Sequence, residues 1–440
     1  MDEREKRLKE LEAKGVVATD ENGIRVVDAS LLQDPVRFRS QDNDERRKVG
    51  KERTKRKPRT SPLKPAAEES PEEEVEQKVL RPSEIKKREQ LNKQFKKEFT
   101  MAEEDVPKGV GLDVGTSFLV AGRFEDDGKI HFSKMRDCFI QLEPKTAINA
   151  KFIKKGLDDR KAPYIEKDGS FYVLGEDAFV MANERHIVTR RPMHRGVLSP
   201  AEKEAFPILQ ELIKRIVGEP RVKGEQLIFS SPAKPIDAEF DQLFHQDMIR
   251  SFINSLGFDA HPMNEAEALA YSELLEEGLT GVAISCGAGM MNVAVLSAGD
   301  PVVTFSTSRS GDWVDQQAAI ATNMTPSIVQ QEKEDPDLDL MDPDPGNQVQ
   351  AAIAVYYGNL LVYTLENIAH DLRSSPQLPK FKDPIPLVVA GGTSLPKGFI
   401  AKFEQALNAV DMPVEISEIR HAPDALHAVS NGLTLAASME

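Results

Sequence analysis

Two short apolar runs joined by glycines mark the hydrophobic pattern in the second half of the chain. Residues 281–299 carry no charge, and the β-type runs 282–284 and 293–296 within them are separated by Gly287 and Gly289. A membrane span requires about 20 consecutive apolar residues, and the glycines and their polar neighbours interrupt this stretch. The pattern therefore predicts a strand, a glycine turn and a second strand.

The same pattern occurs earlier in the chain. Residues 111–121 align with residues 283–293, so that Gly115 matches Gly287 and Asp113 matches Ser285. Because glycine has no Cβ, the backbone N–H groups of such a turn can approach a phosphate closely. One glycine hairpin in each half predicts a duplicated fold that closes on a single ligand from both sides.

Strand-like and helical patterns alternate over the rest of the globular part, which favours an α/β protein with layered sheets. We expect a strand over 130–142, a hairpin over 164–174 that turns at Asp168-Gly169, helices over 206–217, 264–275 and 349–372, strands over 226–230 and 386–390, a glycine loop over 391–398 that opens a helix, and a final helix after Pro423. The acidic loop 332–344 is expected to be a solvated insertion, and a role in subunit contacts is left open.

Residues 1–108 are dense in Lys, Arg and Glu and are interrupted by prolines, so most of this extension is expected to be disordered. Residues 81–99 are the exception, since Leu91, Phe95 and Phe99 recur at helical spacing among lysines and predict a basic helix. That helix is either solvated or in contact with a protein partner or an acidic membrane surface. The sequence from Met101 reads as the start of a self-sufficient domain, so the extension is expected to be either an appendage or the result of a misplaced start site.

Composition narrows the function classes. The chain has 440 residues, 40% of them hydrophobic, and a formal net charge of -15, which argues against nucleic-acid binding because phosphate backbones are held by Lys and Arg. Cys138 and Cys286 lie far apart in apolar stretches and are expected to be reduced, buried thiols. The first residues have no apolar signal region, so a cytoplasmic protein is expected.

Six motifs occur in an order that is typical of one family. The sequence Arg191-Pro-Met-His-Arg-Gly-Val-Leu198 is the most specific, because it resembles the Arg-Pro-Leu-Lys-Asp-Gly-Val-Ile stretch of MreB, the bacterial actin homologue. The chain from Gly109 onward thus resembles the actin-like ATPase superfamily, and within it MreB most closely. The other motifs are a first phosphate loop at 111–117, a connecting helix at 264–271, a second phosphate loop at 281–296, a Gly-Gly-Asp-type motif at 310–315 and an adenosine motif at 388–398.

The resemblance implies a duplicated, ribonuclease-H-like α/β fold with two lobes around a cleft that holds ATP and Mg²⁺. Lobe I would comprise residues 109–263, completed by a C-terminal helix over 422–440, and lobe II residues 264–421. Filament formation by self-association is implied as well. MreB-type proteins commonly lie at the inner face of the plasma membrane, so membrane contact is left open.

The resemblance also assigns roles to individual residues. Asp113 would hold Mg²⁺ through water, since this ion prefers carboxylate and water oxygens. Glu265 would orient the attacking water or accept its proton, although it is equally a first-turn acid favoured by the helix dipole. Asp312 would lie near the ribose or phosphates, unless it only caps a helix. The nucleotide ligands implied are Gly111, Asp113, Gly115, Thr116, Ser117, Ser285, Gly287, Gly289, Gly311, Asp312, Gly391, Gly392 and Thr393.

The second phosphate loop departs from the family. Its usual form is Asp-x-Gly-Gly-Gly-Thr-Thr, whereas this chain has Ser285 for the aspartate, Ala288 for the middle glycine, and Met290 and Met291 for the threonines. Loss of a single group that stabilises a transition state commonly costs about 10² to 10³ in rate. We therefore expect ATP to be bound and hydrolysed slowly or not at all.

Three functions follow from these patterns. The first is a cytoskeletal, ATP-binding protein that forms nucleotide-dependent filaments with weak ATPase activity. The second is a non-polymerising nucleotide-binding scaffold or sensor that recruits a partner through the N-terminal extension. The third, a metabolite kinase of the same superfamily, is least favoured, because the 191–198 motif matches MreB and no acceptor site is apparent.

Overall fold

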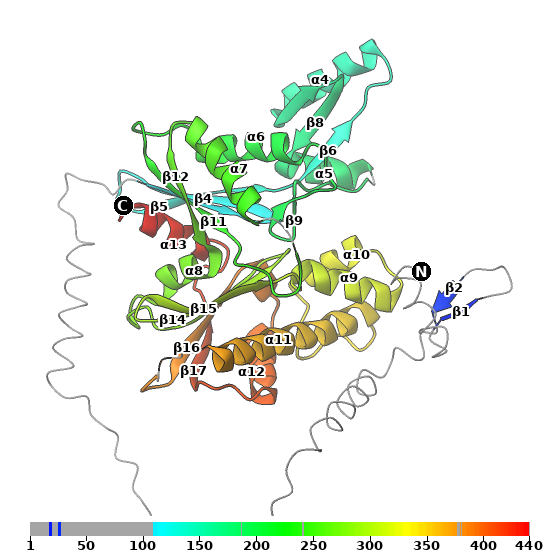
Figure 1. The fold of residues 1–440 in the computed structure, drawn as a ribbon. Helices are drawn as coiled ribbons and strands as arrows, with labels where there is room; N and C mark the ends of the chain where they lie inside the picture. The colour runs from blue at the N-terminus through cyan, green and yellow to red at the C-terminus, as the bar shows by residue number, and fades with distance from the viewer. Residues whose placement is uncertain are drawn as a thin grey trace, which may run out of the picture. The chain divides into compact units, whose positions relative to one another are not determined.

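The computed structural model (Figure 1) describes residues 17–19, 25–27, 109–185, 187–239, 242–375, 379 and 381–439. The first two ranges are the strands β1 (Val17–Thr19) and β2 (Arg25–Val27), which pair antiparallel. The predicted disorder of residues 1–108 and the predicted basic helix over 81–99 lie outside the described residues. The other described elements all belong to the chain from Gly109 onward.

A five-stranded sheet forms the first half of this part, in the order β12-β11-β3-β4-β5. Strands β3, β4 and β5 follow one another antiparallel, whereas β11 runs parallel to both β3 and β12. The strands are β3 (Val110–Val114), β4 (Phe118–Phe124), β5 (Ile130–Arg136), β11 (Gln226–Ser231) and β12 (Asp259–Asn264).

A second five-stranded sheet repeats this topology, in the order β15-β14-β13-β16-β17. Its strands are β13 (Gly281–Cys286), β14 (Met291–Ser297), β15 (Asp300–Thr307), β16 (Ile385–Ala390) and β17 (Ile416–His421). The two glycine turns have the same hydrogen bond, from Gly115 N to Phe118 O at 3.1 Å and from Gly287 N to Met290 O at 3.0 Å. The duplication predicted from the alignment of Gly115 with Gly287 is therefore confirmed.

Helices cover the outer faces of both sheets. The helices α6 (Ala205–Val217) and α7 (Gln242–Ser255) share an apolar core with the first sheet, and α9 (Gly311–Thr322), α10 (Pro326–Lys333), α11 (Gln348–Ser374) and α12 (Phe399–Ala409) share one with the second. In Figure 1 the long helix α11 crosses the lower half beside α12. In the described ranges, no helix has the length and apolar character needed to cross a membrane.

Two short helices, α8 (Glu265–Glu273) and α13 (Ala428–Ala437), lie between the sheets and share an alanine-rich core. They approach so closely that a Cβ on Gly432 would overlap the backbone of Ala268, with the carbonyl carbon at 2.6 Å. Asn264 caps α8, because its Oδ1 accepts from the N–H groups of Ala266 at 2.9 Å and Glu267 at 3.2 Å.

A smaller unit extends from the first half. Its three-stranded sheet has the order β6-β8-β7, formed by β6 (Phe139–Leu142), β8 (Ser170–Leu174) and β7 (Tyr164–Lys167), and it packs with α4 (Ala147–Arg160) and α5 (Gly175–Arg185). Asp168 and Gly169 turn the β7–β8 hairpin with φ of 50° and 75°, as the sequence predicts. The strands β9 (Met193–His194) and β10 (Val197–Leu198) form a short ribbon.

The structure corrects several element boundaries. The strand expected over 130–142 is two strands in different sheets, because the chain bends at Asp137, whose N–H donates to Ser117 O at 2.9 Å. The glycine loop over 391–398 first forms a 3-10 turn (Gly392–Ser394) and reaches α12 only at Phe399. The C-terminal helix begins at Ala428, not directly after Pro423. The division into lobes at residues 263/264 and 421/422 stays a prediction.

We predict that Gly432→Ala destabilises the fold by about 3 kcal/mol or more, because the added methyl group overlaps backbone that cannot move independently. The matched control is Gly156→Ala in the exposed face of α4, where a Cβ meets nothing within 4 Å. That change should instead stabilise the protein by about 1 kcal/mol through helix propensity. Chemical denaturation measures both, and equal stabilities of the two variants would contradict the close crossing of α8 and α13.

Candidate functional site

A cavity of about 590 Å³ lies where the two glycine hairpins face each other. Most of the residues that the sequence analysis assigned to a nucleotide site line this cavity. They come from both halves of the chain. Those lining it are Asp113, Gly115, Thr116, Ser117, Glu265, Ser285, Gly287, Gly289, Asp312, Gly391, Gly392 and Thr393. The structure therefore brings together twelve residues that the sequence analysis had assigned to one site.

Two assigned glycines lie outside the cavity lining. Gly111 lies under α13, where a Cβ would approach Ser430 O to 2.6 Å. Gly311 begins α9, its N–H donates to Gly287 O at 3.3 Å, and a Cβ there would approach Lys333 Nζ to 3.3 Å. Both positions need glycine for packing, and their contact with a nucleotide stays a prediction.

Asp113 lies near the end of β3 with its carboxyl group buried beside the cavity. Its Oδ1 accepts from Ser230 Oγ at 2.8 Å, and the same hydroxyl accepts from Val114 N at 2.8 Å. Burial raises the pKa of Asp113 to about 6, and the hydrogen bond from Ser230 offsets part of this rise. Ser230 was missed from the sequence. It lies near the end of β11, which runs parallel to β3, and this position could have indicated its contact with Asp113.

Glu265 is the first residue of α8, and both of its oxygens accept hydrogen bonds. Ser285 Oγ donates to Oε1 at 2.5 Å, and Asn292 Nδ2 donates to Oε2 at 2.7 Å. The pKa of Glu265 is raised to about 8, mainly by burial and also by the charge of Asp113, while the hydrogen bond from the Ser285 hydroxyl offsets part of the rise. Two acids thus face one cavity, and neutral donors hold both of them in place.

Asn292 also connects this site to the first half of the chain. Its Oδ1 accepts from the N–H of Ala233 at 3.1 Å, in the segment that follows β11. Sequence reasoning had noted Asn292 only as a polar residue in an uncharged run and had given it no role. Its place opposite Ser285 in the β13–β14 register makes it the partner of Glu265.

The loop 191–198 contacts both glycine hairpins. Its Gly196 N–H donates to Thr116 Oγ1 at 3.0 Å, and a Cβ on Gly289 would come within 3.1 Å of Gly196 N. At its start, Arg191 Nη1 donates to both oxygens of Asp312, each at 3.0 Å. This motif therefore links the two halves directly across the cavity.

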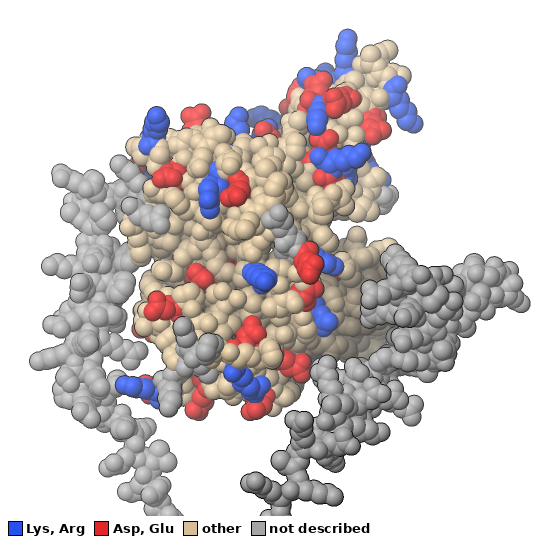
Figure 2. Space-filling model, viewed as in Figure 1, with Lys and Arg blue, Asp and Glu red and all other residues tan. Residues whose placement is uncertain are grey.

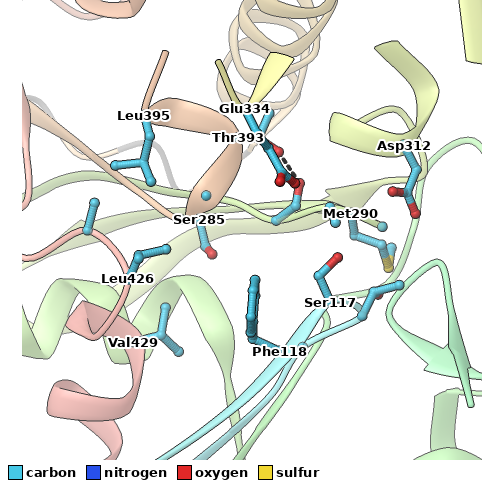
Figure 3. A pocket seen from close by; sticks show the side chains of 18 of the residues that line it. Ser117, Phe118, Ser285, Met290, Asp312, Glu334, Thr393, Leu395, Leu426 and Val429 are labelled. Atoms are coloured by element: carbon cyan, nitrogen blue, oxygen red, sulfur yellow. Dashed lines mark hydrogen bonds between the residues drawn. The ribbon is translucent and has the colours of Figure 1, made fainter. Parts of the chain in front are cut away.

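The remainder of the cavity combines apolar walls with three lysines, Lys134, Lys333 and Lys397. Figure 3 shows Phe118 extending from the first hairpin toward Ser285, with Leu426 and Val429 beside it. Lys134 Nζ lies 4.9 Å from the centre of the Phe118 ring. Lys333 Nζ donates to Asp315 Oδ2 at 2.7 Å and to Gly311 O at 3.2 Å. None of these lining residues except Asp315 had been given a role from the sequence.

Met290 and Met291 replace the two threonines of the usual second phosphate loop and supply no hydroxyl group. Met290 is 3% exposed and Met291 is fully buried, and Met291 belongs to the core under the second sheet. Figure 3 shows Met290 at the hairpin end between Ser117 and Asp312. The second hairpin therefore offers its backbone, but no side-chain hydroxyl at these positions.

The donor set fits Mg²⁺ only in part. In the described ranges, no group of three or more His, Cys, Asp or Glu side chains is arranged to hold a metal ion. Asp113 offers a carboxylate to the cavity, and Glu265 adds a second acid that repels it. Magnesium commonly takes one or two carboxylates and completes its shell with water and phosphate oxygens. The residues therefore suit an ion that arrives with a phosphate ligand.

The sequence profile of the family described as Volactin matches residues 109–437. The chain belongs to the Volactin family. The MamK double helical filament is 19% identical to this Volactin-family chain, with a TM-score of 0.56, and the match covers 76% of this chain and 98% of the MamK chain. MreB 5 of Spiroplasma citri bound to AMPPNP is 16% identical, with a TM-score of 0.54, over 75% and 96% of the two chains. The search of curated protein sequences finds no match.

These likenesses show the fold of the Volactin-family chain. It is an actin-like fold, similar to those of MreB and MamK. The resemblance drawn from the glycine loops and the 191–198 motif is thereby confirmed at the level of the fold.

A buried histidine supports the loop 191–198 and makes the stability of the fold pH-dependent. His245 of α7 is 1% exposed, and its Nδ1 accepts from Leu198 N at 3.2 Å. Burial lowers its pKa from 6.5 to about 4. The unfolded chain therefore binds more protons than the folded one between these values, so stability is complete above pH 6.5 and falls as the pH decreases toward 4.

We predict that, as the pH is lowered, the free energy of unfolding of the wild type decreases by about 1.4 kcal/mol per pH unit more than that of His245→Asn. The Oδ1 of the introduced asparagine keeps an acceptor near Leu198. Urea denaturation between pH 7 and pH 4.5 measures the difference. Parallel pH profiles for the two proteins would show that His245 is not held neutral by burial.

Proposed function

We propose that this chain binds a nucleoside triphosphate with Mg²⁺ between its two glycine hairpins, assembles into filaments under nucleotide control and hydrolyses the nucleotide slowly. The observation that carries the proposal is the pair of equivalent glycine turns that face one cavity beside Asp113 and Glu265. The names of similar structures support it, since they describe a MamK filament and MreB 5 bound to AMPPNP.

Charge and backbone geometry support an anionic ligand. Thr116, Ser117 and Gly289 line the cavity at the two turns, and their backbone N–H groups are the donors we assign to the phosphates. The helices α8 and α13 both begin at the cavity, where Glu265 and Val429 line it, so the positive ends of two helix dipoles lie near the ligand.

Magnesium would bind Asp113 and the phosphates, and when bound it would neutralise charge on the leaving and transferred groups. The chain's own residues then position the ligand. Lys134 supplies a cation at the mouth of the cavity, and Arg191 holds Asp312 in place from the opposite half. Gly391 and Gly392 leave room for the planar base beside Leu395 and Leu426.

Slow hydrolysis follows from the surroundings of Glu265. Both of its oxygens already accept hydrogen bonds from Ser285 and Asn292, so the group is held for positioning and has little freedom to take a proton from water. Ser285 stands where the second phosphate loop of actin-like ATPases usually has an aspartate, and it offers no charge to a metal-bound water. Either loss is worth about 10² or more in rate.

We predict that the full-length protein pellets with ATP and Mg²⁺ but much less with ADP and Mg²⁺ or without nucleotide, and that phosphate release lags far behind assembly. High-speed sedimentation, negative-stain microscopy and a phosphate-release assay on the same samples measure this. Tight ATP binding without pelleting would instead support the non-polymerising scaffold. Phosphate release in step with assembly would contradict the slow-hydrolysis part.

We predict that Asp113→Asn weakens Mg²⁺-dependent ATP binding by at least about tenfold, equivalent to about 1.4 kcal/mol, because the charge that attracts the ion is removed. The control is Asp126→Asn, an exposed aspartate in the turn between β4 and β5. Titration with a fluorescent ATP analogue, with Mg²⁺ and with EDTA, separates the metal-dependent part. Equal affinities of Asp113→Asn and the wild type for ATP in the presence of Mg²⁺ would contradict the assignment of Asp113 as the residue that holds the ion.

A further inference from the structure

Helix α4 leaves one face exposed that combines apolar and basic side chains. Ile148 is 69% exposed and Phe152 is 71% exposed, one turn apart, and the exposed residues Lys151 and Lys155 share their side of the helix by the same spacing. Leu157, on the opposite side, is buried in the core of the smaller unit. We call Ile148, Lys151, Phe152 and Lys155 the apolar-basic face.

This face is open in the part of the chain that the structure describes. Lys154 pairs with Glu166 at 2.7 Å, whereas no described residue forms an ion pair with Lys151 or Lys155. Figure 2 shows Lys and Arg side chains projecting at the upper right, where Figure 1 places α4. Burying a side chain such as Phe152 contributes about 1.5 to 3 kcal/mol of favourable free energy. A partner that covers this face would therefore bind more tightly.

The chain carries a complementary surface in its second half. Residues 334–344, here the acidic segment, contain six Asp and Glu and no Lys or Arg, whereas residues 145–161 around α4 contain six Lys and Arg against two Asp. Met341 is 39% exposed among these acids and supplies an apolar counterpart for Phe152.

The acidic segment is fixed in place rather than loose. Leu338 and Leu340 are buried, and Leu340 N donates to Lys397 O at 2.9 Å. Asp335 Oδ1 accepts from Asp337 N at 2.9 Å, an interaction that stabilises the turn. The backbone that carries the exposed residues Asp337 and Asp342 is therefore held in place.

We propose that the apolar-basic face of α4 in one copy of the chain binds the acidic segment of another copy. This rests on the proposed function, because it names a contact through which copies assemble. A protein with a net charge of -15 repels its own copies at long range, so association needs local complementarity that steers two defined surfaces together. The apolar stripe of α4 is short for a membrane-binding helix, and the matching acidic and apolar groups occur on the same chain.

Charge reversal on each side and then on both tests the contact. Lys151→Glu with Lys155→Glu, or Asp337→Lys with Asp342→Lys, should raise the protein concentration needed for pelleting by at least about tenfold, equivalent to about 1.4 kcal/mol. All four changes in one chain should restore assembly toward the wild-type level. Lys203→Glu with Lys223→Glu, which changes the net charge as the Lys151 and Lys155 variant does but at exposed sites elsewhere, should have little effect. Unchanged pelleting of both paired variants, or no recovery in the fourfold variant, would overturn the proposal.

A second measurement separates this contact from the proposed function. Isotope-labelled and unlabelled full-length proteins are mixed and treated with a carbodiimide, which joins amines to carboxyl groups that touch. Links from Lys151 or Lys155 of one copy to Asp337 or Asp342 of the other support the contact even if no filament pellets. Their absence overturns it even if filaments form. Binding to phosphatidylserine vesicles that is lost in Lys151→Glu with Lys155→Glu, with unchanged pelleting, would assign the face to membrane and overturn it as well.

Discussion

The close crossing of α8 and α13 sets the geometry of the whole site. Each helix packs on a different sheet, and the absence of a side chain at Gly432 lets them meet at the backbone of Ala268. The alanines around this point keep the two sheets near each other, so the glycine hairpins at the sheet ends reach one shared cavity. A larger residue at position 432 would overlap the backbone of Ala268 and could not be accommodated at this crossing.

The acids of the cavity are stabilised by neutral donors from both halves. Ser230 holds Asp113, while Ser285 and Asn292 hold Glu265. Because Asn292 also accepts from Ala233, the position of Glu265 is tied to the segment after β11. The loop 191–198 adds a second tie through Thr116 and Asp312. Relative movement of the halves therefore changes hydrogen bonds at the carboxyl groups themselves.

Much of the fold could be predicted from local sequence. A glycine turn between two apolar runs fixes a hairpin, and its recurrence at Gly115 and Gly287 revealed the duplication. Asn264 was recognisable as a cap because capping depends on only a few neighbouring residues. The bend at Asp137 could not be recognised in this way, since it arises where β5 and β6 join different sheets.

The hydrogen-bond partners of Asp113 and Glu265 were hard to predict for the same reason. Ser285 was identified as the replacement of the usual aspartate and as a nucleotide ligand, but its contact with Glu265, twenty residues earlier in the chain, appeared only in the structure. Asn292 and Ser230 acquire their roles only when strands distant in sequence lie in register.

A serine at position 285 also affects the stability of the folded state when no cation is bound. An aspartate there would place a third acid beside Asp113 and Glu265, and the folded state would then depend on a bound cation to offset their repulsion. The neutral hydroxyl removes that dependence and adds a hydrogen bond. The fold of the Volactin-family chain therefore needs no cation at this position to offset a third charge.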